Sequence, residues 1–300
     1  MIFVKGLGAP ETPRLLPSDK SWLCVEMAPP RSGVTHISRD GSEVTAVART
    51  GLPQGVAPDL EGNIWTLNND PTACLMRVSL DGAMEVLFEE VEGKRMLLTN
   101  DLCFGPGGLL YVTDSGMTMA DWVVDGAVRP DYATARFDGR VYQVDLARHT
   151  ARIIDEGIRF TNGIAIGPDD DLYVAEMISG DILRYHLGGV GAVGRREHFA
   201  NVMSEDWNGG FRGPDGMAFG ADGRLYCTVF GEGNVAVIES DGRVTERIRT
   251  EGANPTNVAF GPDGERRLYV TEHQLGQIEA YDTTTSGLPL YYGGPERVRL

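Results

Sequence analysis

The chain has 300 residues, of which 43 are acidic and 27 are basic, so its formal net charge at pH 7 is −16. A surface this acidic repels phosphate backbones and anionic lipids, so neither nucleic acids nor membranes are expected partners. Hydrophobic residues make up 42% of the chain and charged residues 23%, enough for an ordinary core, so global disorder is excluded too.

The N-terminal segment, MIFVKGLGAPETP, lacks the basic start and the apolar run of a secretory signal. No stretch reaches the ~20 apolar residues that span a bilayer. None of the cysteines forms a C-x-x-C pair, and we expect buried free thiols at Cys24, Cys74, Cys103 and Cys227. These features predict a cytoplasmic protein that acts on a small molecule, as a monomer or a small homo-oligomer.

A repeated pattern runs along the chain: a polar residue, a short apolar run, a turn of Gly, Asp and Pro, then an apolar run with an aromatic residue. The clear copies are QGVAPDLEGNIWTLN from Gln54, NDLCFGPGGLLYVTD from Asn100, NGIAIGPDDDLYVAE from Asn162, DGMAFGADGRLYCTV from Asp215 and TNVAFGPDGERRLYVTE from Thr256. A weaker copy, ETPRLLPSDKSWLCVE, begins at Glu11. Each reads as strand, tight turn, strand.

The second strands of the six copies begin 42 to 62 residues apart, at Trp22, Ile64, Leu110, Leu172, Leu225 and Leu268. This spacing predicts an all-β fold, a six-bladed β-propeller with four-stranded blades around a central metal site, as a single domain over residues 1–300. The last blade is short of strands, and MIFVKGL is expected to complete it and close the ring. Insertions at 115–140 and 202–213 are expected to be loops over one face.

One repeat position carries oxygen-bearing side chains in most blades. It precedes the innermost strand and holds Glu11, Gln54, Asn100, Asn162, Asp215 and Thr256. Inner strands of a propeller line the central channel, so equivalent positions meet around one axis. Hard oxygen donors without Cys or His suit Ca²⁺ or another hard divalent ion. The alternative is that the Asn and Asp side chains only cap turns before strands.

A second column lies at the same face, at the end of the second strands. Its members are Glu26, Asn68, Asp114, Glu176, Val229 and Glu272. It predicts a ring of acidic side chains around the site, with Asp114 and Glu176 in the substrate pocket. The residues that follow are pocket walls or ordinary loop residues: Met27, Asn69, Ser115, Met177, Phe230 and His273. We assign His273, Trp122 and Trp207 to the pocket; for His273, proton transfer and a structural hydrogen bond both stay open.

The motifs PETP, LTND, FTNGIAIGPD and GPDGMAFGADGRLY together resemble the gluconolactonase, regucalcin (senescence marker protein) and luciferin-regenerating enzyme family over nearly the whole chain. The resemblance implies a six-bladed propeller with one central divalent metal, and lactone hydrolysis. The family's metal ligands map onto Glu11, Asn100, Asn162 and Asp215. Diisopropyl-fluorophosphatase is similar in architecture and ligand set. Sugar-lactone members often carry an Arg two residues before the Asn of the third blade, where this chain has Leu98, so a less polar lactone is plausible.

We therefore expect a metal-dependent hydrolase that opens a sugar lactone or a less polar small lactone. One divalent cation, Ca²⁺ first and otherwise Mg²⁺, Mn²⁺, Zn²⁺ or Fe²⁺, would polarise the ring carbonyl for attack by water. Asp215 is the expected general base and Asn100 the second catalytic residue. A carboxylate that binds a metal loses basicity, so Asp101, Asp114 and Glu176 are alternative bases.

Two other functions stay open. The same metal could hydrolyse a phosphotriester or a fluorophosphate, because both reactions need the same electrophile. A propeller can also be a non-catalytic binding module that Ca²⁺ stabilises.

Overall fold

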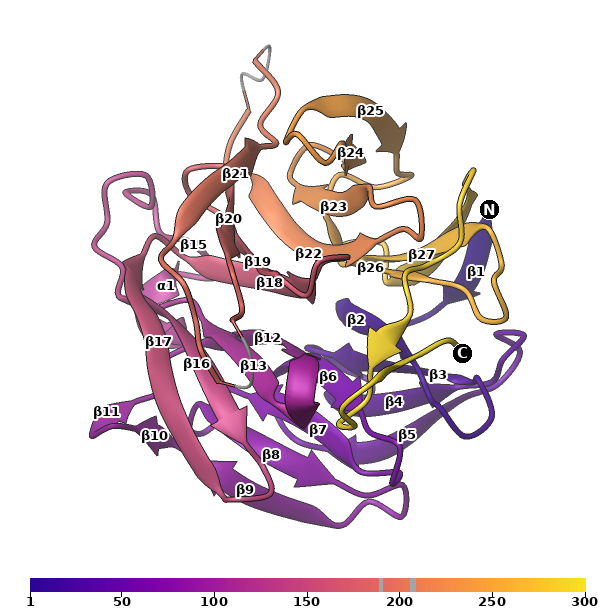
Figure 1. The fold of residues 1–300 in the computed structure, drawn as a ribbon, viewed down its shortest axis with the longest axis horizontal. Coiled ribbons are helices and arrows are strands. Elements are labelled where there is room, and N and C mark those ends of the chain that lie inside the picture. The colour runs from indigo at the N-terminus through magenta and orange to yellow at the C-terminus, as the bar shows by residue number, and fades with distance from the viewer. Residues whose placement is uncertain (189–190, 206–208) are drawn as a thin grey trace.

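Strands dominate the computed structural model, which describes residues 1–188, 191–205 and 209–300. Within these residues, six four-stranded antiparallel sheets stand around a central channel as the blades of a β-propeller (Figure 1). The predicted all-β fold, a six-bladed propeller with four-stranded blades, is thereby confirmed.

Each blade runs from an inner strand beside the channel to an outer strand at the rim. The inner strands are β2 (Pro10–Leu15), β6 (Pro53–Pro58), β12 (Thr99–Phe104), β18 (Thr161–Ile166), β22 (Gly213–Phe219) and β26 (Pro255–Phe260). The second strands are β3 (Trp22–Glu26), β7 (Ile64–Asn68), β13 (Leu110–Asp114), β19 (Leu172–Glu176), β23 (Leu225–Phe230) and β27 (Arg267–Glu272). Their predicted first residues are confirmed, except that β27 begins one residue early.

The third strands are β4 (Gly33–Ile37), β8 (Cys74–Val78), β16 (Gly139–Asp145), β20 (Asp181–Tyr185), β24 (Asn234–Ile238) and β28 (Gln277–Asp282). The outer strands are β5 (Val44–Arg49), β9 (Met84–Phe88), β17 (Thr150–Ile158), β21 (Glu197–Asn201), β25 (Val244–Arg249) and β1 (Ile2–Lys5). Strand β7 is buried throughout, whereas β9 exposes much of its length, because second strands have neighbouring blades on both faces.

The ring is closed by the start of the chain, as predicted. Strand β1 pairs antiparallel with β28, with Ile2 opposite Glu279 and Lys5 opposite Gln277. Phe3 packs edge-on against Tyr269, with 4.9 Å between ring centroids. The last blade therefore has its fourth strand, and β28 presents no open edge to another chain.

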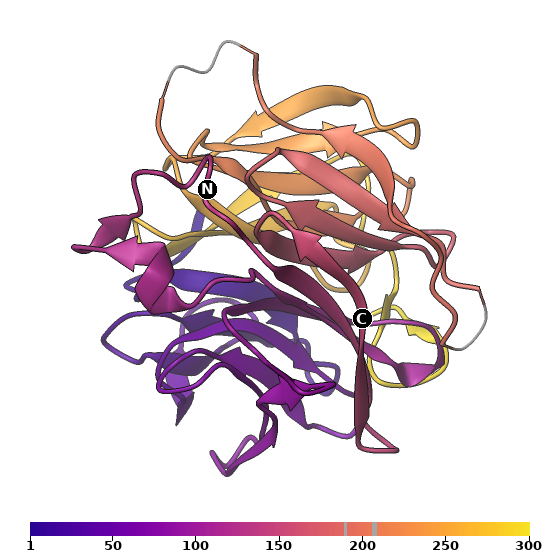
Figure 2. The same ribbon diagram turned by 90° about the vertical axis from the view of Figure 1, so that its left-hand side faces the viewer.

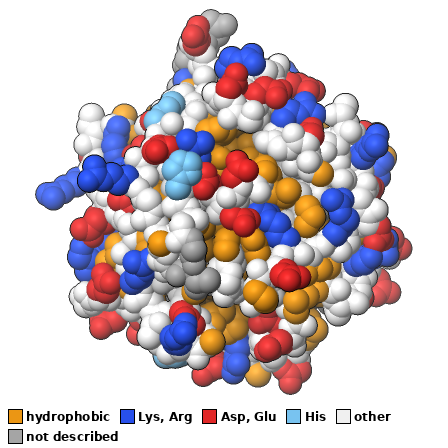
Figure 3. Space-filling view, viewed as in Figure 1, with side chains coloured by type: hydrophobic (Ala, Val, Ile, Leu, Met, Phe, Trp, Pro, Cys, Tyr) orange, Lys and Arg blue, Asp and Glu red, His pale blue; other side chains and the backbone are white. Residues whose placement is uncertain are grey.

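The two faces of the ring carry different segments (Figure 2). The insertion after β13 forms α1 (Met119–Trp122), β14 (Val123–Val124) and β15 (Ala127–Val128) over the face where inner strands begin. The C-terminal strands β29 (Leu290–Tyr291) and β30 (Arg297–Val298) lie over the opposite face. That face shows acidic and basic side chains among apolar ones (Figure 3).

Short elements fill the remaining connections. Strands β10 (Glu90–Val91) and β11 (Lys94–Arg95) form a hairpin before β12, and a 3₁₀ turn, η1 (Pro106–Gly108), joins β12 to β13. Among the described helices, none is long and apolar enough to cross a membrane. The predicted free thiols are confirmed, since all four cysteines are unpaired: Cys24, Cys74 and Cys227 are buried and Cys103 is half-buried.

Every inner strand departs from regular pairing near its first residues. In the described chain, the register shifts fall between Glu11 and Arg14, Pro53 and Val56, Thr99 and Leu102, Thr161 and Ile164, Pro214 and Met217, and Pro255 and Asn257. An irregularity of this kind leaves residues out of the hydrogen-bond ladder and re-aims their side chains. Each of these inner strands thus has one break in its pairing with the second strand, at one level of the channel.

Buried hydroxyl groups bind the carbonyl groups that these breaks release. Thr113 Oγ1 donates to the carbonyl of Asn162 at 2.6 Å, and Thr228 Oγ1 donates to the carbonyl of Thr256 at 2.8 Å. Both bonds run from the second strand of one blade to the inner strand of the next. They satisfy buried backbone groups and join neighbouring blades.

Adjacent inner strands approach each other too closely for a side chain at some positions. A Cβ at Gly163 would lie 2.1 Å from the carbonyl oxygen of Asp215, and one at Gly216 would lie 2.0 Å from the side chain of Asn257. Glycine at these two positions therefore sets the spacing of the inner strands.

We predict that Gly163→Ala destabilises the protein by about 3 kcal/mol, because the new methyl group meets backbone that cannot move aside. The matched control is Gly188→Ala, whose Cβ would meet, among the described residues, only Ala192 at an ordinary 3.8 Å. Urea unfolding of both variants measures the difference. Equal stability of the two variants would show that the inner strands can separate at no cost.

Candidate metal centre

The first column lies inside the inner strands, and not before them as the sequence suggested. Asn100 and Asn162 are the second residues of β12 and β18, and Asp215 is the third residue of β22. All three sit within the register breaks, where the side chain is free of the pattern that alternates along a regular strand. The breaks, which the sequence pattern did not reveal, position the column.

Three carboxylates interact at the axis: those of the buried Asp101 and Asp215 and that of the half-buried Glu11, which we call the acid cluster. Burial raises the pKa of Glu11 well above its usual range, and the charges of Asp215 and Asp101 raise it further. Burial and the charge of Asp101 likewise raise the pKa of Asp215. The pKa of Asp101 is raised by burial, against an opposing effect of Arg14. The cluster holds more negative charge than its surroundings balance.

The two candidate amides lie beside this cluster and contact residues that follow the second strands; a side-chain hydrogen bond from Asn162 also lowers the pKa of Asp215. Asn100 Nδ2 donates to Ser115 Oγ at 3.2 Å, and Asn162 Nδ2 contacts Met177 Sδ at 3.2 Å. Asn162 is 3% exposed, and its Oδ1 has no hydrogen-bond partner in the described part of the molecule. A buried amide oxygen without a donor is uncommon, and a cation would satisfy it.

The donors fit a hard divalent ion. No group of three or more His, Cys, Asp or Glu side chains in the described ranges is arranged to hold a metal by itself. Glu11 and Asp215 would supply the charge, and Asn100 and Asn162 the neutral oxygens. Mixed carboxylate and amide oxygens are the ligands that Ca²⁺ and similar cations take in proteins.

Two residues of the same layer, Arg14 and Asn257, escaped the sequence analysis, which named their partner Asp101 only as an alternative base. Asp101 Oδ2 accepts from Asn257 Nδ2 at 3.1 Å, and the Arg14 guanidinium lies 3.6 Å from Asp101 Oδ1. Asn257 also contacts Thr12 Oγ1 at 3.3 Å. A signal was available: Asp101 and Asn257 directly follow column residues, whereas the blades of Asn162 and Asp215 have glycine there.

The second column does not present free carboxylates to a substrate. Asp114 is fully buried and accepts from the backbone N–H groups of Leu97 at 2.8 Å, Leu98 at 3.0 Å and Gly116 at 2.9 Å. Tyr142 donates to the same carboxylate at 3.1 Å. With its oxygens occupied, Asp114 anchors the segment that leads into β12, and we drop it from the pocket.

The same arrangement recurs in other blades, where a side chain at the end of the second strand accepts a backbone N–H from the segment before the inner strand. The pairs are Glu26 with Gly8, Asn68 with Leu52, Glu176 with Arg159, and Glu272 with Asn254. Glu176 also accepts from Ser179 Oγ at 2.9 Å. Its contacts are those of a loop anchor, so we drop Glu176 from the pocket as well.

An apolar cluster covers the face beside the candidate metal centre. Its buried members are Leu98, Met117, Trp122, Phe137, Phe160 and Met177, and half-buried Tyr132, Phe211 and Phe230 pack against them. Trp122 lies 4.6 Å from Phe160 and 5.1 Å from Phe211 between ring centroids. The insertions thus meet over this face, as expected. Met177 joins the cluster to the candidate ligand Asn162.

Of the other predicted pocket residues, the structure describes His273 but not Trp207. His273 is half-buried, with its ring 6.4 Å from that of Phe230, and burial lowers its pKa. Trp207 lies outside the described residues. Of the predicted pocket, the structure thus brings Trp122 and His273 to the apolar side of the face.

Several relatives of known name are lactonases. A gluconolactonase of Zymomonas mobilis is 26% identical over 230 residues, which cover 74% of this chain and 61% of that protein. The 6-deoxy-6-sulfogluconolactonase of Pseudomonas putida is 32% identical over 137 residues, 45% of each protein. The matched part thus spans less than two thirds of these curated relatives.

Solved structures share the fold over nearly their whole length. The calcium-binding regucalcin of Agrobacterium tumefaciens superimposes with a TM-score of 0.75 at 19% identity, covering 97% of this chain and 99% of that one. A gluconolactonase of Xanthomonas campestris gives 0.74 at 22% identity, covering 96% and 89%. The family model described as the SMP-30/Gluconolactonase/LRE-like region matches residues 10–274, and the chain belongs to this family.

Proposed function

We propose that this protein hydrolyses lactones at one divalent cation held by Glu11, Asn100, Asn162 and Asp215. The observation that carries the proposal is the buried Asn162 Oδ1, which has no donor in the described residues and adjoins the acid cluster. The lactonase names of the relatives support the substrate class. Calcium is the first choice because all the donors are hard oxygens and the Agrobacterium neighbour is a calcium-binding protein.

A hard divalent cation, when bound, supplies Lewis-acid polarisation of a carbonyl group. Asp215 takes the proton of the attacking water while the new C–O bond forms at the carbonyl carbon. It returns this proton to the ring oxygen as the ring C–O bond breaks. The half-exposed Asn100, held by Ser115, orients the lactone. The product is a hydroxy acid, which releases one proton on ionising near pH 7.

The surroundings of the site favour a lactone with an apolar substituent. Ser115 and Met177, which directly follow the second strands of their blades, contact the candidate ligands Asn100 and Asn162. Phe230 holds the last position of β23 in the blade of Asp215, and it packs 5.8 Å from Phe211. Leu98 is 1% exposed within the same cluster, so its position offers no polar group to pair with sugar hydroxyls.

Removal of divalent metal is predicted to abolish lactone hydrolysis and to lower the thermal stability. Addition of Ca²⁺ at one hundred times its Kd should restore activity and stabilise the fold by about 2.7 kcal/mol, because the ion binds only the folded state. Proton release with a pH indicator and thermal unfolding measure the two effects. Full activity after exhaustive chelation contradicts a metal-dependent reaction.

Asp215→Asn is predicted to lower kcat by at least ~100-fold, because the amide cannot accept the proton. Without metal, this variant should be at least as stable as the parent, since one of three repelling carboxylates is gone. Asp222→Asn is the matched control, as Asp222 pairs with Arg224 in the turn after β22. Turnover retained by Asp215→Asn would exclude Asp215 as the base.

An alkyl- or aryl-substituted γ- or δ-lactone is predicted to have a higher kcat/KM than glucono-δ-lactone. Phe230→Ala should reduce kcat/KM for the apolar lactone about tenfold and leave that for glucono-δ-lactone nearly unchanged, because only the apolar substituent loses buried contact. The control is Phe199→Ala, which removes another half-buried ring, packed on Tyr173 in the rim of its blade.

The outcomes of this panel separate the hypotheses. A preference for glucono-δ-lactone would overturn the apolar substrate and leave the lactonase proposal intact. Turnover of phosphotriesters without any lactone would overturn the lactonase proposal. Metal stabilisation without any turnover would make the protein a binding module.

A further inference from the structure

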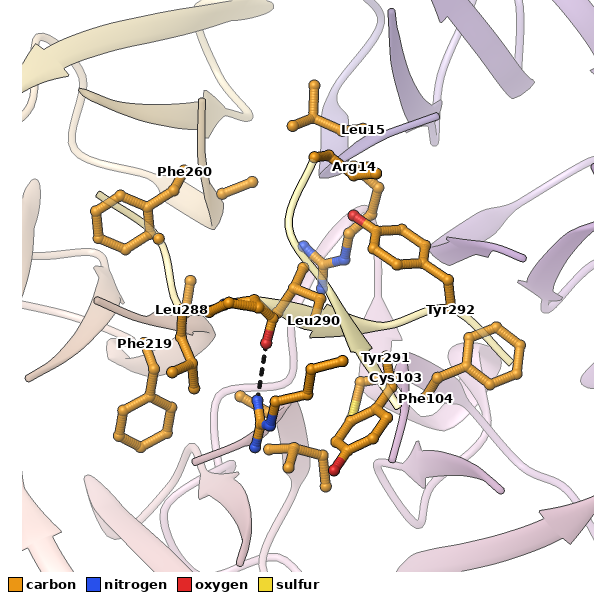
Figure 4. Close-up of a pocket in the computed structure, with 18 of the residues that line it drawn as sticks. Arg14, Leu15, Cys103, Phe104, Phe219, Phe260, Leu288, Leu290, Tyr291 and Tyr292 are labelled. Atoms are coloured by element: carbon orange, nitrogen blue, oxygen red, sulfur yellow. Dashed lines mark hydrogen bonds between the residues drawn. The ribbon is translucent and has the colours of Figure 1, made fainter. Parts of the chain in front are cut away.

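Arg14 places a buried positive charge beside the acid cluster. It lies on β2, three residues after Glu11, and its guanidinium reaches into the middle of the channel (Figure 4). Nη2 lies 3.6 Å from Asp101 Oδ1, and Nη1 lies 3.0 Å from the carbonyl oxygen of Pro13 and 3.5 Å from Asn257 Oδ1. The side chain is 13% exposed, so this charge depends on its protein partners.

The channel beyond Arg14 is mainly apolar. It holds a cavity of about 110 Å³ whose lining includes Leu15, Phe104, Phe219 and Phe260, and the C-terminal segment borders it (Figure 4). Arg297, another arginine along the cavity, pairs with Asp170 at 2.6 Å on the far face. Arg14 therefore lies between the acid cluster and an apolar space, and in the described residues its carboxylate partner is Asp101.

The charges of this layer have a simple sum. Glu11, Asp101 and Asp215 bring three negative charges when ionised, and Arg14 brings one positive charge. Asn257 holds the other oxygen of Asp101 and is neutral. The remainder is a charge of −2, which one divalent cation neutralises. Without Arg14 the same layer would carry −3.

We propose that Arg14 is a positioning residue that acts through Asp101 to set the charge of the metal centre and match it to a single divalent cation. The inference rests on the proposed function, because it assumes that Glu11 and Asp215 hold the cation. It goes further in naming a side chain, which is not itself a ligand, as the determinant of which cation charge the site selects. Coulombic attraction at a buried site scales with the product of charges, so selectivity between divalent and trivalent ions reports on it directly.

The test is a calorimetric titration of the metal-free full chain with Ca²⁺ and, separately, with Tb³⁺. Arg14→Met should raise the ratio of Tb³⁺ to Ca²⁺ affinity at least tenfold over the parent. Arg14→Lys, which keeps the charge, should keep the parental ratio. Asp101→Asn, which leaves −1, should weaken Ca²⁺ binding at least tenfold and lower the ratio.

The double variant Arg14→Met with Asp101→Asn restores a charge of −2, so the parental ratio should return. This variant also answers the case in which Arg14→Met fails to fold because Asp101 has lost its partner. Arg297→Met is the matched control, since it removes another arginine along the cavity, one that pairs with Asp170, and should leave the ratio unchanged.

Two results would overturn the inference: an unchanged ratio in Arg14→Met, or a double variant that binds unlike the parent. No cation binding by the parent chain would overturn the proposed function itself. Parental Ca²⁺ binding with an unchanged ratio in Arg14→Met would overturn only the role of Arg14.

Discussion

Neighbouring inner strands of the ring approach each other so closely that some positions have no room for a side chain. The other features of the centre follow from this close approach. At Gly163 and Gly216 even a methyl group would meet the neighbouring blade. Regular pairing fails at the same level of every described blade, and buried hydroxyls of Thr113 and Thr228 bind the carbonyls concerned. The polar side chains at the breaks have little room except around the axis, so they gather there and form the candidate metal centre.

Crowding at the axis also sets the electrostatics. Carboxylates from three blades, on Glu11, Asp101 and Asp215, are pressed together away from water, where like charges repel strongly. Asn257 and Arg14 relieve Asp101, whereas Glu11 and Asp215 are relieved by hydrogen bonds alone, those of Thr12 and Thr256 to Glu11 and those of Gly216 and Asn162 to Asp215. The propeller thus holds an unfavourable charge arrangement at its axis, which the proposed cation would relieve.

The repeat predicted most of the fold, because each copy of strand, turn and strand is a local pattern. It placed five second strands at their first residues and assigned the start of the chain to the last blade. The site was harder to predict from the sequence. A repeat position tells which residues share a level of the ring, but not where a side chain at a strand end points. The sequence therefore predicted Asp114 as an acidic residue of the pocket, whereas in the structure it is a buried anchor for the segment before β12. Arg14 and Asp101 are 87 positions apart, and only the closed ring brings them together.

The pairing of β1 with β28 has a consequence for the order of events during synthesis. Ile2 cannot pair with Glu279 until Glu279 has been synthesised. The ring of a nascent chain therefore stays open through almost all of translation. Glu11, in the first blade, and Asp215, in the fifth, cannot hold one ion until that ring has formed. Contacts so distant in sequence make folding slow, and the waiting strands are open to wrong partners. Cation capture would then mark the moment at which a newly made molecule has closed.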